Sequence, residues 1–173
     1  MSANFIDIAD YKTKQLNDIL FVAHQIKSGL ISPTPLLNKT IAMIFEKSST
    51  RTRISFEVGI KQLGGTPLVL TSDDMQLSRG ETIADTARVM SRYVDAVMIR
   101  AQSHKTLLEF KEYSEIPIIN GLTNVSHPCQ IMADIMTIQE NFNCIEGLNI
   151  SWFGDSNNVL KSWIDAATKF KFN

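Results

Sequence analysis

The strongest signal in the sequence is the stretch Phe45-Glu46-Lys47-Ser48-Ser49-Thr50-Arg51-Thr52-Arg53. It begins at the end of the apolar run 41–45, which predicts a buried strand, and it opens a helix predicted over 50–63. Where a strand passes into a helix, free backbone N–H groups meet the positive end of the helix dipole. They are joined here by a guanidinium and by the hydroxyls of Ser49, Thr50 and Thr52. These residue types favour a phosphate site, the alternative being a simple Ser/Thr cap followed by surface arginines.

The two arginines of this stretch are expected to have different roles. Arg51 and Arg53 are two residues apart, which is roughly 200° around a helix, so they should not hold the same ligand. Arg53 stands four residues before Glu57, the spacing of a helical ion pair. The sequence contains no GxxxxGK[ST] motif, which argues against a P-loop NTPase.

Strands alternate with helices along the rest of the chain. Apolar runs predict strands at 41–45, 68–70, 96–99, 116–119 and 150–153. Helical periodicity predicts helices at 11–27, 50–63, 82–93, 104–113, 129–142 and 159–170. This alternation predicts an α/β fold, a three-layer αβα arrangement around a central parallel sheet. Ligands of such sheets bind beyond the carboxyl ends of the strands, and candidate residues are therefore sought there.

Two further polar groups follow predicted strands. Arg100 ends the strand at 96–99, where an arginine is either an edge charge or a ligand contact. His127-Pro128-Cys129-Gln130 precedes the helix at 129–142. The proline keeps His127 out of the helical conformation and suits the first helical turn. The imidazole and the amide of Gln130 can then face the same crevice.

The loop after the last predicted strand, Gly154-Asp155-Ser156-Asn157-Asn158, is less specific. It lacks the second and third glycines of a dinucleotide fingerprint, which argues against that function. Its asparagines either bind a small polar substrate or form a turn.

The composition is that of an ordinary globular chain. Its 173 residues include 17 Lys and Arg against 18 Asp and Glu, a net charge of −1, and 44% are hydrophobic. This balance argues against disorder and against general nucleic-acid binding. No apolar stretch approaches the roughly 18 residues of a membrane span, and the N-terminus lacks the basic segment of a secretory signal. We therefore expect a cytoplasmic protein that binds neither nucleic acid nor membrane.

The two cysteines give no sign of a metal or redox site. Cys129 and Cys144 match neither a CxxC pair nor a zinc-binding spacing. A disulfide between them would be unusual in a cytosolic chain. We interpret both as small, buried thiols.

Together these motifs resemble the transcarbamoylase family, most closely its ornithine carbamoyltransferases, over essentially the whole chain. Ser-Thr-Arg-Thr-Arg at 49–53 looks like the family's carbamoyl-phosphate motif, and His-Pro-Cys-Gln at 127–130 looks like its second signature. Phe-Glu-Lys at 45–47, Gln76 and Arg-Gly-Glu-Thr at 79–82 also resemble the ornithine enzymes. Aspartate transcarbamoylases usually have a proline before the first motif, where Ser48 stands here, and a lysine in the polar loop 72–80, which has none.

The resemblance implies a role for each matched residue. The phosphate of carbamoyl phosphate would be held by Ser49, Thr50, Arg51 and Thr52. Arg100 would bridge the phosphate and the carbonyl oxygen, His127 would also contact the carbonyl, and Gln130 would contact the carbamoyl amine. Gln76 would reach the carbamoyl phosphate of a neighbouring subunit in a homotrimer, and Asn158 would contact ornithine. The implied catalytic residues, which stabilise charge on the carbonyl oxygen, are Arg100, His127 and Thr52.

The activity implied is carbamoyl transfer from carbamoyl phosphate to the δ-amine of L-ornithine, giving L-citrulline and phosphate, in arginine metabolism and without a cofactor. The implied domains are a carbamoyl-phosphate-binding domain at 1–145 and the start of a truncated ornithine-binding domain at 146–173. The family's Asp-x-x-x-Ser-Met-Gly loop and His-Cys-Leu-Pro segment are absent. The alternatives are a non-catalytic module for carbamoyl phosphate or another phosphorylated metabolite, and a transcarbamoylase for aspartate, putrescine or N-acetylornithine.

Overall fold

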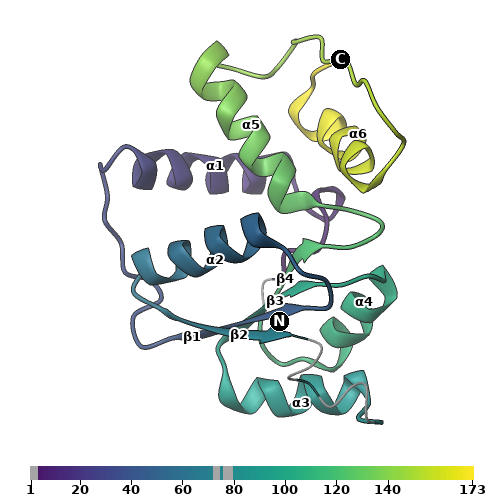
Figure 1. The fold of residues 1–173 in the computed structure, drawn as a ribbon. Helices are drawn as coiled ribbons and strands as arrows, with labels where there is room; N and C mark the ends of the chain where they lie inside the picture. The colour runs from purple at the N-terminus through teal and green to yellow at the C-terminus, as the bar shows by residue number, and fades with distance from the viewer. Residues whose placement is uncertain (1–3, 72–74, 76–79) are drawn as a thin grey trace. The chain divides into compact units, whose positions relative to one another are not determined.

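The computed structural model describes residues 4–71, 75 and 80–173 (Figure 1). The chain divides into two compact units. The sheet unit comprises Pro33–Asn124 together with Asn4 and Phe5, and the helical unit comprises Ile6–Ser32 and Val125–Asn173. These units are defined by packing, whereas the domain boundary between 145 and 146 stays a prediction.

A parallel sheet forms the centre of the sheet unit (Figure 1). Its four strands, in the spatial order β2-β1-β3-β4, are β1 (Thr40–Phe45), β2 (Thr66–Thr71), β3 (Ala96–Arg100) and β4 (Ile118–Leu122). One face is covered by α2 (Thr50–Gln62), and the other by α3 (Ile83–Tyr93) and α4 (His104–Tyr113). The predicted αβα arrangement around a parallel sheet is confirmed.

The two central strands are the most deeply buried. Ala42 and Met43 of β1 and Val97 and Met98 of β3 are inaccessible to solvent. Both strands read as continuous apolar runs because helices cover both faces of the sheet. The chain leaves β1 through α2 on one face and leaves β3 through α4 on the other. The carboxyl ends of β1 and β3 therefore flank a topological switch point, the usual ligand site of such a sheet.

Strand β4 begins two residues later than predicted, at Ile118 instead of 116. Pro117 has no N–H to contribute to a ladder, although its carbonyl accepts from Val97 N at 2.9 Å. The strand continues to Leu122, whose carbonyl accepts from Ala101 N at 2.9 Å. The polar pair Asn120-Gly121 concealed this extension in the sequence because it interrupts the apolar run.

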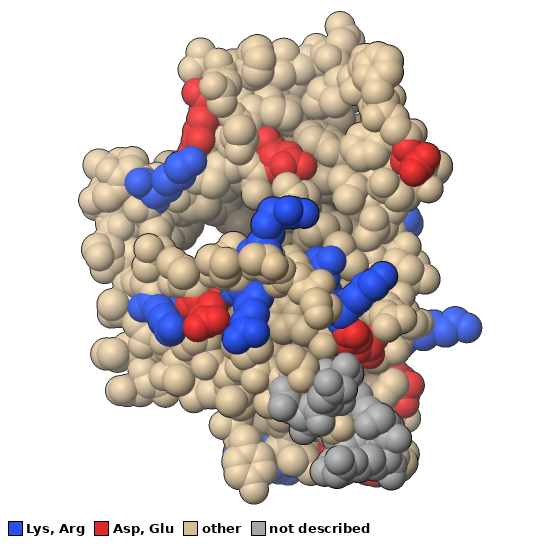
Figure 2. Space-filling model, in the orientation of Figure 1, with Lys and Arg blue, Asp and Glu red and all other residues tan. Residues whose placement is uncertain are grey.

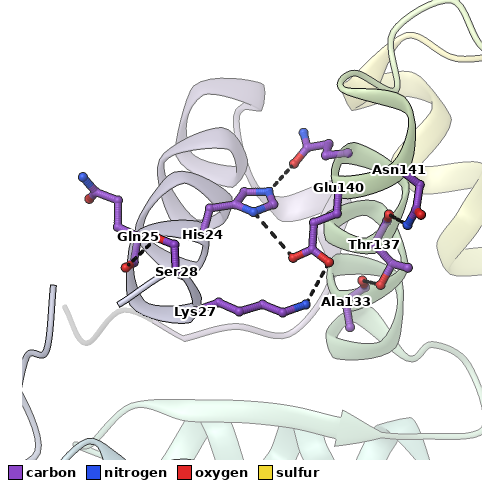
Figure 3. Close-up of polar contacts among 9 residues, drawn as sticks. His24, Gln25, Lys27, Ser28, Ala133, Thr137, Glu140 and Asn141 are labelled. Atoms are coloured by element: carbon purple, nitrogen blue, oxygen red, sulfur yellow. Dashed lines mark hydrogen bonds and ion pairs between the residues drawn. The ribbon is translucent and has the colours of Figure 1, made fainter. Parts of the chain in front are cut away.

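The helical unit contains a 3₁₀ turn and three helices. The turn is η1 (Ile8–Asp10), and the helices are α1 (Thr13–Lys27), α5 (Pro128–Phe142) and α6 (Asn158–Phe170). Polar contacts join α1 to α5: His24 Nε2 lies 3.0 Å from Gln139 Oε1, and Lys27 Nζ donates to Glu140 Oε2 at 2.8 Å (Figure 3). Within the described ranges, none of the helices combines the length and the apolar character needed to cross a membrane.

The strand predicted at 150–153 is not formed, and the segment is irregular with Phe153 94% exposed. Two hydrogen bonds of 2.8 Å join Asn173 to the start of this segment. The N–H of Asn173 donates to Leu148 O, and the carbonyl of Asn173 accepts from Ile150 N. In a parallel pair of strands, one residue bonds in this way to two residues of the other strand that are two positions apart. The apolar pattern is right for a strand, but the described chain supplies no further strand beside it.

The cysteines differ from each other. Burial raises the pKa of the Cys129 thiol to about 12, which keeps it protonated at neutral pH. Cys144 is exposed, and its Sγ lies 3.6 Å from the carbonyl oxygen of Glu146. The prediction of two buried thiols is therefore wrong for Cys144, which lies just beyond the end of α5, and holds only in part for Cys129, whose accessibility is intermediate. The two do not form a disulfide.

Two glycines of the sheet unit should respond to alanine with opposite signs. A Cβ at Gly121 would overlap with Met98 Sδ and would lie 3.2 Å from Ile99 O, in the core between β3 and β4. Gly121→Ala should therefore lower the free energy of unfolding by about 1–3 kcal/mol through overpacking. Gly59→Ala in α2, where a Cβ meets nothing within 4 Å, should raise it by about 0.5–1 kcal/mol. Urea unfolding of both variants measures this, and equal changes would contradict the packing described.

Candidate functional site

The site begins at the first turn of α2. Ser49 is the N-cap residue, and its Oγ accepts from Thr52 N at 3.3 Å. The Ser49 carbonyl accepts from Arg53 N at 3.2 Å, which starts the helical ladder. The N–H groups of Thr50 and Arg51 have no partner within the helix, as at any helix start. The cap alternative is thus correct for Ser49, and it leaves N–H donors of the first turn available to an anion.

Arg100 reaches this turn from the neighbouring strand. The register of β1 with β3 sets Arg100 opposite Phe45, at the carboxyl end of both strands. Its Nη1 donates to Thr52 Oγ1 at 3.1 Å. Its Nε is buried and, among the described residues, has no hydrogen-bond partner. A buried donor without a partner is costly, so an acceptor that reached this atom would be stabilising.

The electrostatics of the turn favour an anion. Burial, and then the positive charge of Arg51, lower the pKa of the Arg100 guanidinium. Arg51 and Arg100 therefore carry two positive charges that are close enough to repel each other. A bound anion would reduce this repulsion and would compensate for the loss of water around Arg100.

The other two cations of α2, Arg53 and Lys61, share the single carboxylate of Glu57. Arg53 Nε lies 3.8 Å from Glu57 Oε2, and Lys61 Nζ lies 3.0 Å from Glu57 Oε1. Figure 2 shows this mixture of basic and acidic side chains on the face that it presents. The ion pair predicted between Arg53 and Glu57 is confirmed. It gives Arg53 Nε a carboxylate close by, whereas the Nε of Arg100 has no hydrogen-bond partner among the described residues.

A cavity of about 330 Å³ opens beside the same turn, on the side of β2. Ser48, Ser49 and Thr50 give it a polar wall, and Arg53 also lines it. Its apolar wall consists of Phe45, Ile54 and Val69. The ion pair with Glu57 gave no indication in the sequence that Arg53 also borders a cavity.

The residues of the second motif belong to the helical unit. His127 precedes α5 with φ −140° and ψ 68°, outside the helical region, and Pro128 is the first residue of the helix, as predicted. The His127 N–H donates to Ser162 Oγ at 2.9 Å, and that hydroxyl donates to Asn158 O at 3.1 Å. Ser162 is buried and links His127 to the first turn of α6. The sequence offered no signal for it, because a serine inside a helix is usually unremarkable.

The side chains of the remaining candidates have separate surroundings. Gln130 Nε2 donates to Asp134 Oδ1 at 2.8 Å, one turn along α5. Burial raises the pKa of Asp134, and the bond from Gln130 opposes this shift. The N-cap of α6 is Asn157, whose Oδ1 accepts from Val159 N at 3.0 Å, while Asn158 is the first residue of the helix. Gln76 lies outside the described residues, and its role stays a prediction.

The structure therefore assembles one part of the predicted site within a single unit. The sheet unit brings together, at the ends of β1 and β3, the residues Ser49, Thr50, Arg51, Thr52 and Arg100. The helical unit contains His127, Gln130 and Asn158.

Comparison with known proteins agrees with this geometry. Residues 3–140 match the family model described as aspartate/ornithine carbamoyltransferase, carbamoyl-P binding domain. An ornithine carbamoyltransferase of Nitrobacter winogradskyi is 53% identical over 98% of this chain, which spans 56% of that relative's length.

Solved structures give the same result. The ornithine carbamoyltransferase of Pyrococcus furiosus superposes with a TM-score of 0.92 at 45% identity, over 98% of this chain and 55% of that one. The enzyme of Thermus thermophilus superposes with a TM-score of 0.94 at 32% identity, over 98% and 59%. This chain thus spans little more than half the length of the relatives that it matches. The chain belongs to the aspartate/ornithine carbamoyltransferase family.

Proposed function

We propose that the sheet unit binds carbamoyl phosphate at the carboxyl ends of β1 and β3. The phosphate is held by the first turn of α2, through Ser49, Thr50, Arg51 and Thr52. Arg100 bridges the phosphate and the carbonyl oxygen. The observation that carries this proposal is the buried Nε of Arg100, which has no acceptor among the described residues and stands beside the positive charge of Arg51.

The reaction to which this site contributes is carbamoyl transfer to the δ-amine of ornithine, giving citrulline and phosphate. The neutral amine attacks the carbamoyl carbon, and negative charge grows on the carbonyl oxygen. Thr52, Arg100 and His127 stabilise that charge as an oxyanion hole does, where one donor is worth about 10²–10³-fold in rate. Phosphate leaves while Arg51 and the helix terminus still neutralise it. Gln130 contacts the carbamoyl amine.

The remaining features of the proposal follow from the family. The 53% identity to an ornithine carbamoyltransferase supports ornithine as the acceptor, which Asn158 would contact, within arginine metabolism. Residues 146–173 would begin the ornithine-binding domain, and the parallel hydrogen bonds between Asn173 and the segment 148–150 support this. We further propose a cytoplasmic homotrimer in which Gln76 reaches the carbamoyl phosphate of a neighbouring subunit.

Arg51 and Arg53 should contribute differently to the binding of carbamoyl phosphate. Arg51→Ala should weaken the binding of carbamoyl phosphate by about 1.5–3 kcal/mol, the size of a hydrogen bond to a charged group. Arg53→Ala should change the affinity little, because Arg53 pairs with Glu57. Calorimetric titration with carbamoyl phosphate, and with inorganic phosphate as competitor, measures both. Equal losses in the two variants would contradict the assignment of the two arginines to opposite faces of α2.

A second experiment separates a catalytic half from a non-catalytic binding module. Residues 1–173 are joined to the part of the Pyrococcus furiosus enzyme that lies beyond its match to this chain, and citrulline is measured. The proposal predicts citrulline formation by this fusion, and a loss of about 10²–10³-fold in rate on Arg100→Ala. A folded fusion that binds carbamoyl phosphate but makes no citrulline would favour the binding module.

A further inference from the structure

Glu46 makes two hydrogen bonds across the switch point. It is the first residue after β1, and its side chain is half-buried. Its Oε2 accepts from Gln102 N at 2.6 Å, and its own N–H donates to Arg100 O at 3.0 Å. One bond ends on the last residue of β3 and the other on the connection that follows it. Together they hold the main chain immediately after the Arg100 side chain.

Support from β1 matters because the other side of Arg100 is irregular. The register between β3 and β4 shifts between Ile99 and Arg100, which interrupts the regular ladder at this residue. The bond to Gln102 has a carboxylate acceptor, and such charge-assisted bonds are roughly twice as strong as neutral ones. The main chain near Arg100 is therefore held more regularly on the side of β1 than on the side of β4. On the β1 side, Glu46 supplies a hydrogen bond with a charged acceptor.

Glu46 carries a negative charge, although it lies close to a site proposed to bind an anion. A carboxylate close to a site for an anion weakens anion binding through repulsion. The Glu46 carboxylate is directed to a backbone N–H, that of Gln102, at 2.6 Å. Its contribution at this end of the sheet is thus geometric: it fixes the turn 46–49 relative to the strand end that carries Arg100.

We propose that Glu46 is a positioning residue for the anion site. It acts through the main chain of Gln102 and Arg100, and so keeps the guanidinium in bonding distance of Thr52 and of the phosphate. This inference rests on the proposed function, because the site that Glu46 serves is the phosphate site at the ends of β1 and β3.

Asp95 offers a matched control at the opposite end of the same two strands. Its Oδ2 accepts from Thr40 N at 2.8 Å, and its N–H donates to Thr40 O at 2.8 Å. It also pairs with Lys39 at 2.7 Å. Asp95 thus fastens β1 to β3 as Glu46 does, but at the amino ends of the strands, away from the anion site. Its removal loosens the strand pair without touching the turn 46–49.

The test is the affinity for inorganic phosphate and for carbamoyl phosphate, measured by calorimetry on the full chain together with urea unfolding. Glu46→Ala should weaken the binding of both anions about 10-fold, the equivalent of one hydrogen bond. Glu46→Gln keeps an acceptor oxygen and removes the repulsive charge, so it should bind both within about twofold of the unmodified chain or more tightly. Asp95→Ala should lose stability and keep its affinity within about twofold.

The outcomes distinguish this inference from the function on which it rests. If the unmodified chain binds neither anion, the phosphate site is wrong, and the role of Glu46 is wrong with it. If the unmodified chain binds and Glu46→Ala binds equally well or better, only the role of Glu46 is overturned. Equal weakening by Glu46→Ala and Asp95→Ala would also overturn it, because general loosening of the strands would then explain the loss.

Discussion

The parallel pairing of β1 with β3 is the constraint on which the site depends. Its register sets Phe45 opposite Arg100, so that the turn into α2 and the guanidinium meet at one edge of the sheet. The pairing is secure because both strands are buried on both faces, where apolar side chains contribute most to stability. A shift of one residue would reverse the facing of Arg100 and remove it from Thr52. The core of the sheet unit thus determines the geometry of the site.

Arg100 shows how a site can be prepared before its ligand arrives. Its guanidinium is partly desolvated, bonded to Thr52 on one nitrogen and left with a buried Nε that has no acceptor among the described residues. The nearby charge of Arg51 adds repulsion. Both effects cost stability without a ligand, and a bound dianion would reverse them, so their relief would contribute part of the proposed binding free energy. Preorganised charge of this kind suits a reaction whose leaving group is phosphate.

Local apolar and helical patterns in the sequence predicted most of this arrangement. They failed where contacts between distant residues determine the structure. The alternation of strands and helices gave the layers, and the position of Arg100 after an apolar run gave its place at a strand end. The strand predicted at 150–153 is absent because a strand needs neighbours, which a local pattern does not report. The cap made by Ser49 leaves the helix start open to an anion, a detail that residue types alone left ambiguous. The link from His127 to Ser162 joins residues 35 apart, beyond any local signal.

We interpret the buried Nε–H of Arg100 as the hydrogen-bond donor that a bound anion would accept from. This interpretation is tested most directly by following the arginine Nε–H signals in ¹⁵N-correlated NMR spectra while inorganic phosphate is added, with the signals of Arg100 and Arg53 assigned from lysine variants. We expect a saturable shift of the Arg100 signal, to lower field as its hydrogen bond forms, while the Arg53 signal stays in place beside Glu57. A saturable shift of the Arg53 signal with none at Arg100 would contradict it.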